Sequence, residues 1–306
     1  MRRICAVLAG LSIVLTAKAQ ELEIDPDEIL QSVQEWAKDN LDDTALDELG
    51  VDKERVQKFL AELRKRFQGS YVYDLGALHE TATNLLPVLK QFEETRPYAV
   101  WLQTRLDYFD VSEELRREAK PDKTGPSRLP NPSPRAESSV WVREVRRRPL
   151  PPLARDCVPR LKEIFTAEKL PPELVWVAEV ESSFDPAARS PSGAVGMFQL
   201  MPGTARSLNL SLRPSDERLQ TEKSARAAAR HLRRLYGQFG DWRLALAAYN
   251  AGEGRVGELL QKQKARTFEA IAGRLPAETQ LYVPKVEATL REREGVTLAE
   301  LKPAAD

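Results

Sequence analysis

Cysteine and histidine are the scarcest chemically reactive residues in this sequence, with two of each in 306 residues. Cys5 lies in the N-terminal segment described below, so Cys157 is left alone and no internal disulfide is expected. No pairing motif places His79 or His231 beside Cys157, which favours a half-buried structural thiol over a nucleophile. Neither histidine belongs to a ligand-spaced cluster, so zinc is disfavoured and we expect no metal or cofactor.

An excess of charge of one sign is also missing, because 46 Lys and Arg balance 46 Asp and Glu. Proteins that bind nucleic acid through phosphate contacts usually carry excess positive charge, so we expect no nucleic-acid partner. Long apolar runs are absent beyond residue 19. We therefore expect a mature chain that is soluble and has no transmembrane span.

The first nineteen residues have the layout of a secretory signal peptide. Arg2 and Arg3 precede a mostly apolar stretch at 4–16, and small residues at 17 and 19 supply a cleavage site. The apolar stretch is too short for a comfortable membrane anchor, and no cysteine follows it for lipid attachment. This pattern predicts export.

Apolar spacing along the chain predicts an all-α (mainly α) protein of two parts. Residues 20–120 read as a small helical module, and residues 121–139 read as a Pro-rich linker because five prolines stand among polar residues. Residues 140–306 are again helical, with no alternation long enough for a substantial sheet. We interpret the arginines of 143–148 as a solvated charged face, with attraction to anionic wall polymers as the alternative.

Residues 170–186 predict an apolar helix that carries two glutamates. Prolines at its start suit a first turn, and Pro186 cannot continue it. Burial raises the pKa of a carboxyl group on such a helix, as a general acid at neutral pH requires. Glu179 and Glu181 lie roughly 200° apart around a helix, so they cannot face one cleft. We assign the acid to Glu181, in the last turn, and a core arginine partner to Glu179.

Four segments follow Glu181 in an informative order: Glu181-Ser182, the sequence SPSGAVGMFQLMPGTA at 190–205, AYNAG at 248–252, and ETQLYV at 278–283. Together they resemble the motifs of the soluble lytic transglycosylase family, most closely its membrane-bound lytic transglycosylase D branch. The resemblance covers roughly the C-terminal half. The LysM repeats that often follow the catalytic domain in that branch are not expected here.

The resemblance implies a lysozyme-like catalytic domain over residues 140–306 that acts on peptidoglycan glycan strands. Glu181 would protonate the MurNAc-GlcNAc glycosidic oxygen and then accept the proton of the C6 hydroxyl that attacks C1, leaving 1,6-anhydro-MurNAc. Such a reaction needs no second carboxylate, unlike ordinary glycosidases. Asp185, the nearest rival, directly precedes Pro186 and is assigned to a turn.

The same resemblance implies a substrate-binding set around Glu181. Gly193 and Gly196 enclose a turn that needs positive φ or close approach. Asp241 is expected to cap the helix that ends near Tyr249. Glu278 is left open between a substrate contact and a buried ion pair. The implied binding residues are Ser190, Gln199, Met201, Tyr249, Asn250, Glu278 and Tyr282.

Two other functions remain open from sequence: a lysozyme-type hydrolase that releases reducing ends, and a noncatalytic wall-binding protein. No loss of a motif residue supports the second. Export and the resemblance together indicate the periplasm or the extracellular cell-wall space. Protein partners of the N-terminal module are not indicated.

Overall fold

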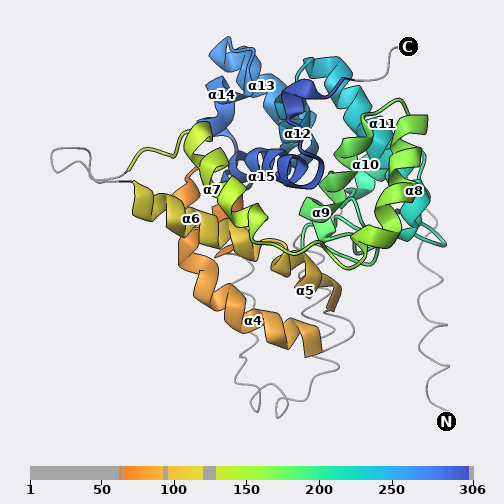
Figure 1. The fold of residues 1–306 in the computed structure, drawn as a ribbon, viewed down its shortest axis with the longest axis horizontal. Helices are drawn as coiled ribbons and strands as arrows, with labels where there is room; N and C mark the ends of the chain where they lie inside the picture. Colours follow the sequence, from red (N-terminus) through yellow and green to blue (C-terminus); the bar gives the residue numbers. More distant parts are fainter. Residues whose placement is uncertain (1–61, 64, 92–95, 120–128, 303–306) are drawn as a thin grey trace, which may run out of the picture.

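The computed structural model describes residues 62–63, 65–91, 96–119 and 129–302. Within these ranges the chain is helical, and its only β pairings are isolated bridges at Arg189–Val195 and Val195–Leu200 (Figure 1). The prediction of an all-α protein is confirmed. The predicted signal peptide with Cys5 lies outside the described residues. In the part that is described, each helix is too short or too polar to cross a bilayer.

The first group of helices occupies the lower left of Figure 1. It consists of the 3-10 turns η1 (Val72–Asp74) and η2 (Gly76–Leu78) and the helices α4 (His79–Gln91), α5 (Arg96–Gln103), α6 (Leu106–Glu118) and α7 (Pro134–Arg146). The apolar residues of 97–109 are spaced as in a single helix. The chain instead turns between α5 and α6, so that Thr104 and Arg105 point into the protein and are buried.

Helix α7 corrects the predicted linker of 121–139. The Ser133 hydroxyl accepts a hydrogen bond from the backbone N–H of Ala136, and Pro134 is the first helical residue. Proline is well suited to that position because its backbone φ is preset and its missing donor is not needed. The last prolines of the segment therefore start a helix, and the linker prediction is wrong from Ser133 onward.

The second group of helices occupies the right, the top and the centre of Figure 1. It consists of α8 (Ala154–Ala167), η3 (Pro172–Trp176), α9 (Val177–Ser182), α10 (Pro202–Ser207), η4 (Glu217–Leu219), α11 (Thr221–Phe239), α12 (Trp242–Ala251), α13 (Glu253–Gln263), α14 (Phe268–Ile271), η5 (Ala272–Arg274), α15 (Ala277–Glu294) and η6 (Leu298–Glu300).

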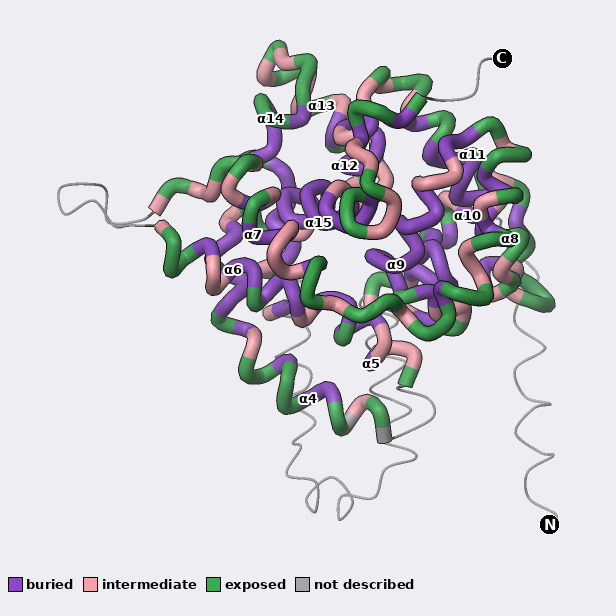
Figure 2. Tube along the Cα trace, viewed as in Figure 1, coloured by how far each residue is buried: buried purple, intermediate pink, exposed green. Residues whose placement is uncertain are grey.

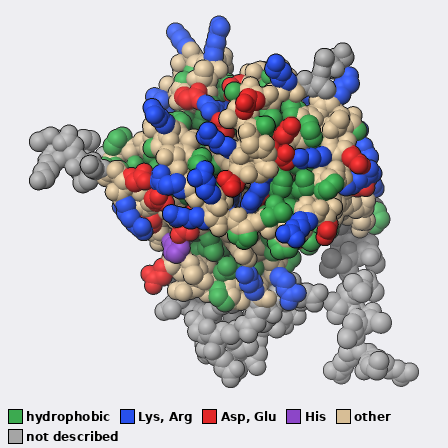
Figure 3. All heavy atoms as spheres, viewed as in Figure 1, with side chains coloured by type: hydrophobic (Ala, Val, Ile, Leu, Met, Phe, Trp, Pro, Cys, Tyr) green, Lys and Arg blue, Asp and Glu red, His purple; other side chains and the backbone are tan. Residues whose placement is uncertain are grey.

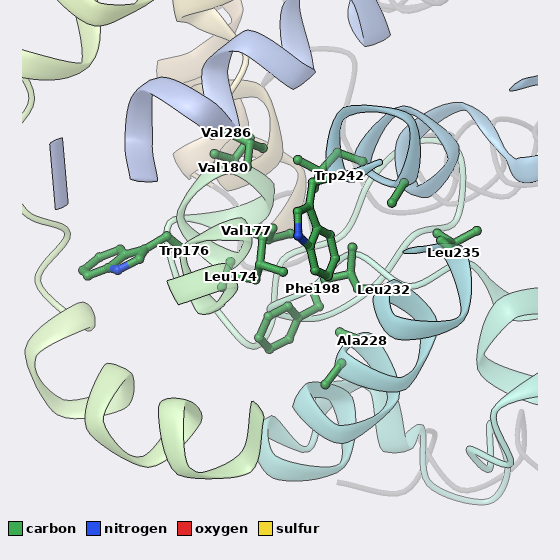
Figure 4. Packing of buried hydrophobic residues seen from close by; sticks show 14 of the residues in the cluster. Leu174, Trp176, Val177, Val180, Phe198, Ala228, Leu232, Leu235, Trp242 and Val286 are labelled. Carbon is green, nitrogen blue, oxygen red and sulfur yellow. The ribbon is translucent and has the colours of Figure 1, made fainter. Parts of the chain in front are cut away.

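Helix α9 is buried along its whole length (Figure 2). The helix predicted over 170–186 is shorter in the structure: a 3-10 turn precedes it, and Ser183 and Phe184 end it with φ of 53° and 66°. In Figure 4, Val177 lies toward Trp242 of α12 and Val180 lies beside Val286 of α15. Burying one such valine contributes about 1.5–3 kcal/mol, so this packing fixes where α9 ends.

A second hydrophobic cluster joins the two predicted parts of the chain. Its members come from residues 63–115, from α7 through Val140 and Trp141, and from α15 through Ala277 and Leu281. Tyr282 and Val286 on the same α15 belong to the cluster around α9. Helix α15 thus lies between two cores, and the N-terminal segments pack directly onto the C-terminal half.

The arginines of 143–148 are paired more than the sequence suggested. Arg143 lies 2.8 Å from Glu114 and also binds Glu118, both on α6. Arg148 binds the buried Asp107. The interpretation as a solvated face is therefore wrong for Arg148, whereas the Arg143 side chain is 39% exposed and pairs at the surface; both arginines tie α6 to the residues around α7. Figure 3 shows Lys and Arg side chains intermixed with Asp and Glu on this face of the molecule.

Candidate active site

Glu181 lies in the last turn of α9 and is 4% exposed. The end of this helix is held by Ser182, whose hydroxyl donates a hydrogen bond to the Met197 carbonyl at 2.8 Å. Glu179 points to the other side of α9, where Arg293 donates to its two carboxylate oxygens at 2.8 and 3.0 Å. The prediction that Glu179 pairs with a core arginine is confirmed, which leaves Glu181 as the candidate acid on α9.

Two side chains distant in sequence contact Glu181. The Tyr282 hydroxyl donates to Oε1 of Glu181 at 2.8 Å. On the other carboxylate oxygen, Oε2, Nη2 of Arg105 lies at 3.4 Å, while Nη1 of Arg105 donates to the backbone carbonyl of Glu181 at 2.8 Å. Nη2 of Arg105 also lies 3.5 Å from Oε1 of Glu278. Arg105 therefore connects the two glutamates that the sequence had proposed for the site.

The surroundings of Glu181 raise the pKa of its carboxyl group. Burial is the largest cause, and the negative charge of Glu278 acts in the same direction. The guanidinium of Arg105 and the hydrogen bond from Tyr282 act against this rise in the Glu181 pKa. A carboxyl group with a raised pKa keeps its proton closer to neutral pH, which is what a general acid requires.

The two site tyrosines act as neutral hydrogen-bond donors. Burial raises the pKa of both Tyr249 and Tyr282 well above the usual value for a phenol. The Tyr249 hydroxyl donates to the Phe198 carbonyl at 2.7 Å, which joins the end of α12 to the loop before α10. His231 lies against the Tyr249 ring, and burial lowers its pKa to about 4, so its imidazole is uncharged near neutrality.

The loop of 190–200 is built around two glycines with positive φ, as the sequence predicted. Gly193 and Gly196 have φ of 85° and 86°. A Cβ atom on Gly196 would lie 2.1 Å from the backbone carbonyl oxygen of Arg218, so no larger residue fits without a shift of the backbone. Arg218 in turn donates to the carbonyls of Gly193 and Leu200, both at 2.9 Å.

Ser190 and Gln199 hold this loop through their own side chains. The Ser190 hydroxyl accepts from the Ala194 N–H at 3.0 Å, and the Gln199 amide donates to the carbonyls of Ala188 and Gly196 at 3.1 and 2.9 Å. Oε1 of Gln199 is buried and has no hydrogen-bond partner among the described residues. The loop therefore uses the Ser190 hydroxyl and the Gln199 amide N–H groups in its own hydrogen bonds. The Gln199 amide oxygen is the acceptor that these bonds leave unused.

The remaining predicted binding residues lie around the same elements. Met201, directly before α10, is 43% exposed. Oδ1 of Asn250 accepts from the Thr279 hydroxyl at 2.6 Å, which links the 248–252 motif to the start of α15. Glu278 is partly exposed, with 18% of its side chain accessible, and shares Arg105 with Glu181. The sequence left two roles open for Glu278, an ion pair or a substrate contact, and the ion pair with Arg105 is present.

Two predicted local roles are confirmed by hydrogen bonds. Oδ1 of Asp185 accepts from the Ala187 N–H at 2.7 Å, which is the turn geometry expected before Pro186. Oδ1 of Asp241 accepts from the Leu244 N–H at 2.9 Å and so caps α12. Asp185 is therefore engaged in a turn of the backbone.

Cys157 is partly buried against the main core, and burial raises the pKa of its thiol. A raised thiol pKa lowers the thiolate fraction, so the residue is suited to packing and not to nucleophilic attack. Over the described ranges, no three His, Cys, Asp or Glu side chains gather as they would around a metal ion.

Sequence reasoning missed Arg105, which is 3% exposed although it is an arginine. The only local signal is a basic residue between the apolar positions Leu102 and Leu106. The partner of Arg105 lies 76 positions away in the chain, and a single sequence does not reveal that pairing.

Comparison with known proteins finds a family match within the C-terminal half. Residues 162–272 match the family described as Transglycosylase SLT domain, which confirms the resemblance to the soluble lytic transglycosylase family. Membrane-bound lytic murein transglycosylase D of Escherichia coli (strain K12) is 43% identical over 123 residues, 39% of this chain and 27% of that protein. Soluble lytic murein transglycosylase of Salmonella typhimurium is 38% identical over 121 residues, 37% of this chain and 19% of that protein.

The chain thus spans about a quarter or less of the length of these curated relatives. Among solved structures, the 70 kDa soluble lytic transglycosylase of Escherichia coli is similar at a TM-score of 0.42 and 21% identity, covering 89% of this chain and 50% of that one. An inactive mutant of lytic transglycosylase Slt from Pseudomonas aeruginosa is similar at a TM-score of 0.39 and 20% identity, covering 81% of this chain and 48% of that one. TM-scores at this level are too low to define the fold of this chain.

Proposed function

We propose that this protein is a peptidoglycan lytic transglycosylase, because residues 162–272 match the family described as Transglycosylase SLT domain. Its substrate is the β-1,4 bond between MurNAc and GlcNAc in the glycan strands, and its product is a strand with a 1,6-anhydro-MurNAc end. The names of the curated relatives, which include lytic murein transglycosylases, support this substrate class.

In this reaction Glu181 serves first as acid and then as base. Its proton passes to the glycosidic oxygen, the bond from that oxygen to C1 of MurNAc breaks, and GlcNAc leaves as an alcohol. The C6 hydroxyl of the same MurNAc forms a new bond to C1, and its proton passes to the Glu181 carboxylate. The enzyme is restored, and no water is consumed.

The observation that carries this proposal is the environment of one carboxyl group. Glu181 is buried, receives a hydrogen bond from Tyr282 at 2.8 Å, and has a raised pKa because of burial. Asp185 is engaged in a turn, so it is poorly placed to activate a water molecule on the other face of the sugar. The nucleophile is then supplied by the substrate itself, at a high effective concentration.

We assign substrate contacts to Ser190, Gln199, Met201, Tyr249, Asn250, Glu278 and Tyr282, as the resemblance implied. Met201 is the best supported of these, because its side chain is exposed beside the loop. Gln199 contributes an amide oxygen that no described residue binds. A protein with this activity acts in the periplasm or the extracellular cell-wall space, which agrees with the signal pattern of residues 1–19.

Mass spectrometry of the muropeptides released from purified sacculi tests the reaction type. An anhydro end is lighter than the hydrolysed end by one water, so the two products separate directly. We expect anhydro ends to dominate a timed digest. Predominant reducing ends would make the protein a hydrolase of the lysozyme type, and no release at all would support a wall-binding protein.

A further inference from the structure

Arg105 lies outside residues 162–272, and yet its guanidinium contacts both glutamates of the candidate site. We propose that Arg105 is a positioning residue for Glu181: its single positive charge is shared with Glu278 while Glu181 holds a proton, and it stabilises the Glu181 carboxylate once that proton has been given away. This inference rests on the proposed function. It means that the SLT domain alone does not contain the whole site.

One buried cation faces two carboxyl groups in this arrangement. A single guanidinium compensates one buried carboxylate, and a second ionised carboxylate without a partner is costly. The group of three is therefore most stable with one proton on the pair. The Glu181 side chain is 5% exposed and that of Glu278 is 18% exposed, so desolvation favours the proton on Glu181.

The guanidinium of Arg105 lies almost equally close to the two carboxyl groups. Its Nη2 is 3.4 Å from Oε2 of Glu181 and 3.5 Å from Oε1 of Glu278. Charge-assisted hydrogen bonds are shorter, about 2.7–2.9 Å, so Nη2 is not committed to either carboxyl group. When Glu181 loses its proton, the new negative charge forms beside a cation already in place, and such preorganised charge needs no rearrangement to act.

Arg105 is itself held from several directions. Nη1 donates to the Thr104 hydroxyl and to the Glu181 carbonyl, both at 2.8 Å, and the guanidinium lies 5.3 Å from the centre of the Trp101 ring. Lys285 of α15 donates to the Thr104 carbonyl at 2.7 Å. The turn that presents Arg105 is thereby fastened to α15, the helix that carries Glu278 and Tyr282.

Among the described residues, five polar side chains interact electrostatically with Glu181, and two of them are charged. Burial raises the pKa of Tyr108, Tyr249 and Tyr282 well above the usual phenol value, so all three side chains are neutral. Arg105 and Glu278 are left to tune Glu181 by charge. The groups that face it are Arg105 from the α5–α6 turn, Tyr108 from α6, Tyr249 from α12, and Glu278 and Tyr282 from α15.

The test is the pKa of Glu181 itself, followed by ¹³C NMR of the glutamate carboxyl carbons during a pH titration of the full chain. The Glu181→Gln variant assigns the signal. Removing the cation in Arg105→Gln raises the Glu181 pKa, and removing the competing anion in Glu278→Gln lowers it, each by about one to three units. The Arg105→Lys variant keeps the charge and holds the Glu181 pKa close to the wild-type value.

Arg293→Gln is the matched control, because Arg293 binds Glu179 on the opposite side of the same helix with similar burial. It leaves the Glu181 pKa unchanged. Release of anhydro-muropeptides from sacculi gives a second readout: Arg105→Gln is slower by about 10- to 100-fold even where Glu181 is protonated, and the alkaline limit of its pH profile moves upward.

These readouts separate the two proposals. If the wild-type chain releases nothing from sacculi, the proposed function fails, while the NMR titration still decides the role of Arg105. If Arg105→Gln fails to fold, the test is the downward shift of the Glu181 pKa in Glu278→Gln. That variant should fold, since Glu278 is partly exposed. A Glu181 pKa that stays in place in Glu278→Gln, or in a folded Arg105→Gln, overturns the positioning role.

Discussion

The hydroxyl of Tyr282 donates a hydrogen bond to Oε1 of Glu181 at 2.8 Å, and neither side chain has appreciable contact with solvent. This bond joins the end of α9 to the middle of α15 across 101 positions of sequence. It favours the ionised form of Glu181, which the proposed reaction produces after the first proton transfer. The bond therefore supports the step in which Glu181 gives up its proton.

The Tyr282→Phe variant tests that bond. Loss of a hydrogen bond to a charged group costs about 1.5–3 kcal/mol, which corresponds to a rate lower by about 10- to 100-fold if the bond acts in the transition state. The initial rate of muropeptide release measures it. Tyr236→Phe, which alters a tyrosine stacked on Trp242 away from Glu181, is the control and keeps its rate. Equal rates for Tyr282→Phe and wild type would remove the bond from the mechanism.

Glu181→Gln is expected to change the pH dependence of stability. Burial raises the pKa of Glu181 in the folded state above its value in the unfolded chain. The folded state then binds the proton more tightly, so the stabilisation is fully present below the unfolded pKa and is lost as the pH rises through the folded pKa.

Glutamine carries no such proton. The unfolding temperature of Glu181→Gln should therefore rise relative to that of the wild type as the pH rises through this range. Thermal unfolding followed by circular dichroism at a series of pH values measures the difference. An unfolding temperature of Glu181→Gln that falls relative to that of the wild type as the pH rises would contradict a raised pKa at Glu181.

The shared core predicts that the C-terminal half depends on the N-terminal segments. A chain of residues 140–306 lacks Arg105 and the apolar partners of Leu281 on α15. We expect it to be inactive on sacculi and to unfold at lower temperature, whereas residues 62–306 retain activity. Full activity of the shorter chain would restore the two-part organisation that the sequence had predicted.

Gly196→Ala tests the loop that carries Gln199. A Cβ atom there would lie 2.1 Å from the Arg218 carbonyl oxygen, and φ is +86°. We expect a loss of more than about 1 kcal/mol in the free energy of unfolding, because both the space and the backbone conformation exclude alanine. Gly203→Ala in α10 is the control, since nothing lies within 4 Å of its added Cβ. Chemical denaturation compares the two, and equal midpoints would refute the close approach.

Features set by local chemistry were accessible from the sequence. A proline, a cap or a spacing of two residues was enough to predict the turn at Asp185, the cap at Asp241 and the opposite faces of Glu179 and Glu181. The turn between α5 and α6 was not accessible, because Trp101 and Phe109 fit a single apolar stripe. The placement of Arg105 depends on contacts with α9 and α15, which no local pattern encodes.

The rate of release from sacculi by Glu181→Gln tests the central claim most directly. Glutamine keeps the shape of the side chain but neither donates nor recovers a proton, so we expect a loss of at least about 10²- to 10⁴-fold with the fold intact. Asp185→Asn, measured beside it, should retain most of the activity because Asp185 serves a turn. Near wild-type release by Glu181→Gln, or a loss in Asp185→Asn as complete as that in Glu181→Gln, would contradict a reaction carried by Glu181 alone.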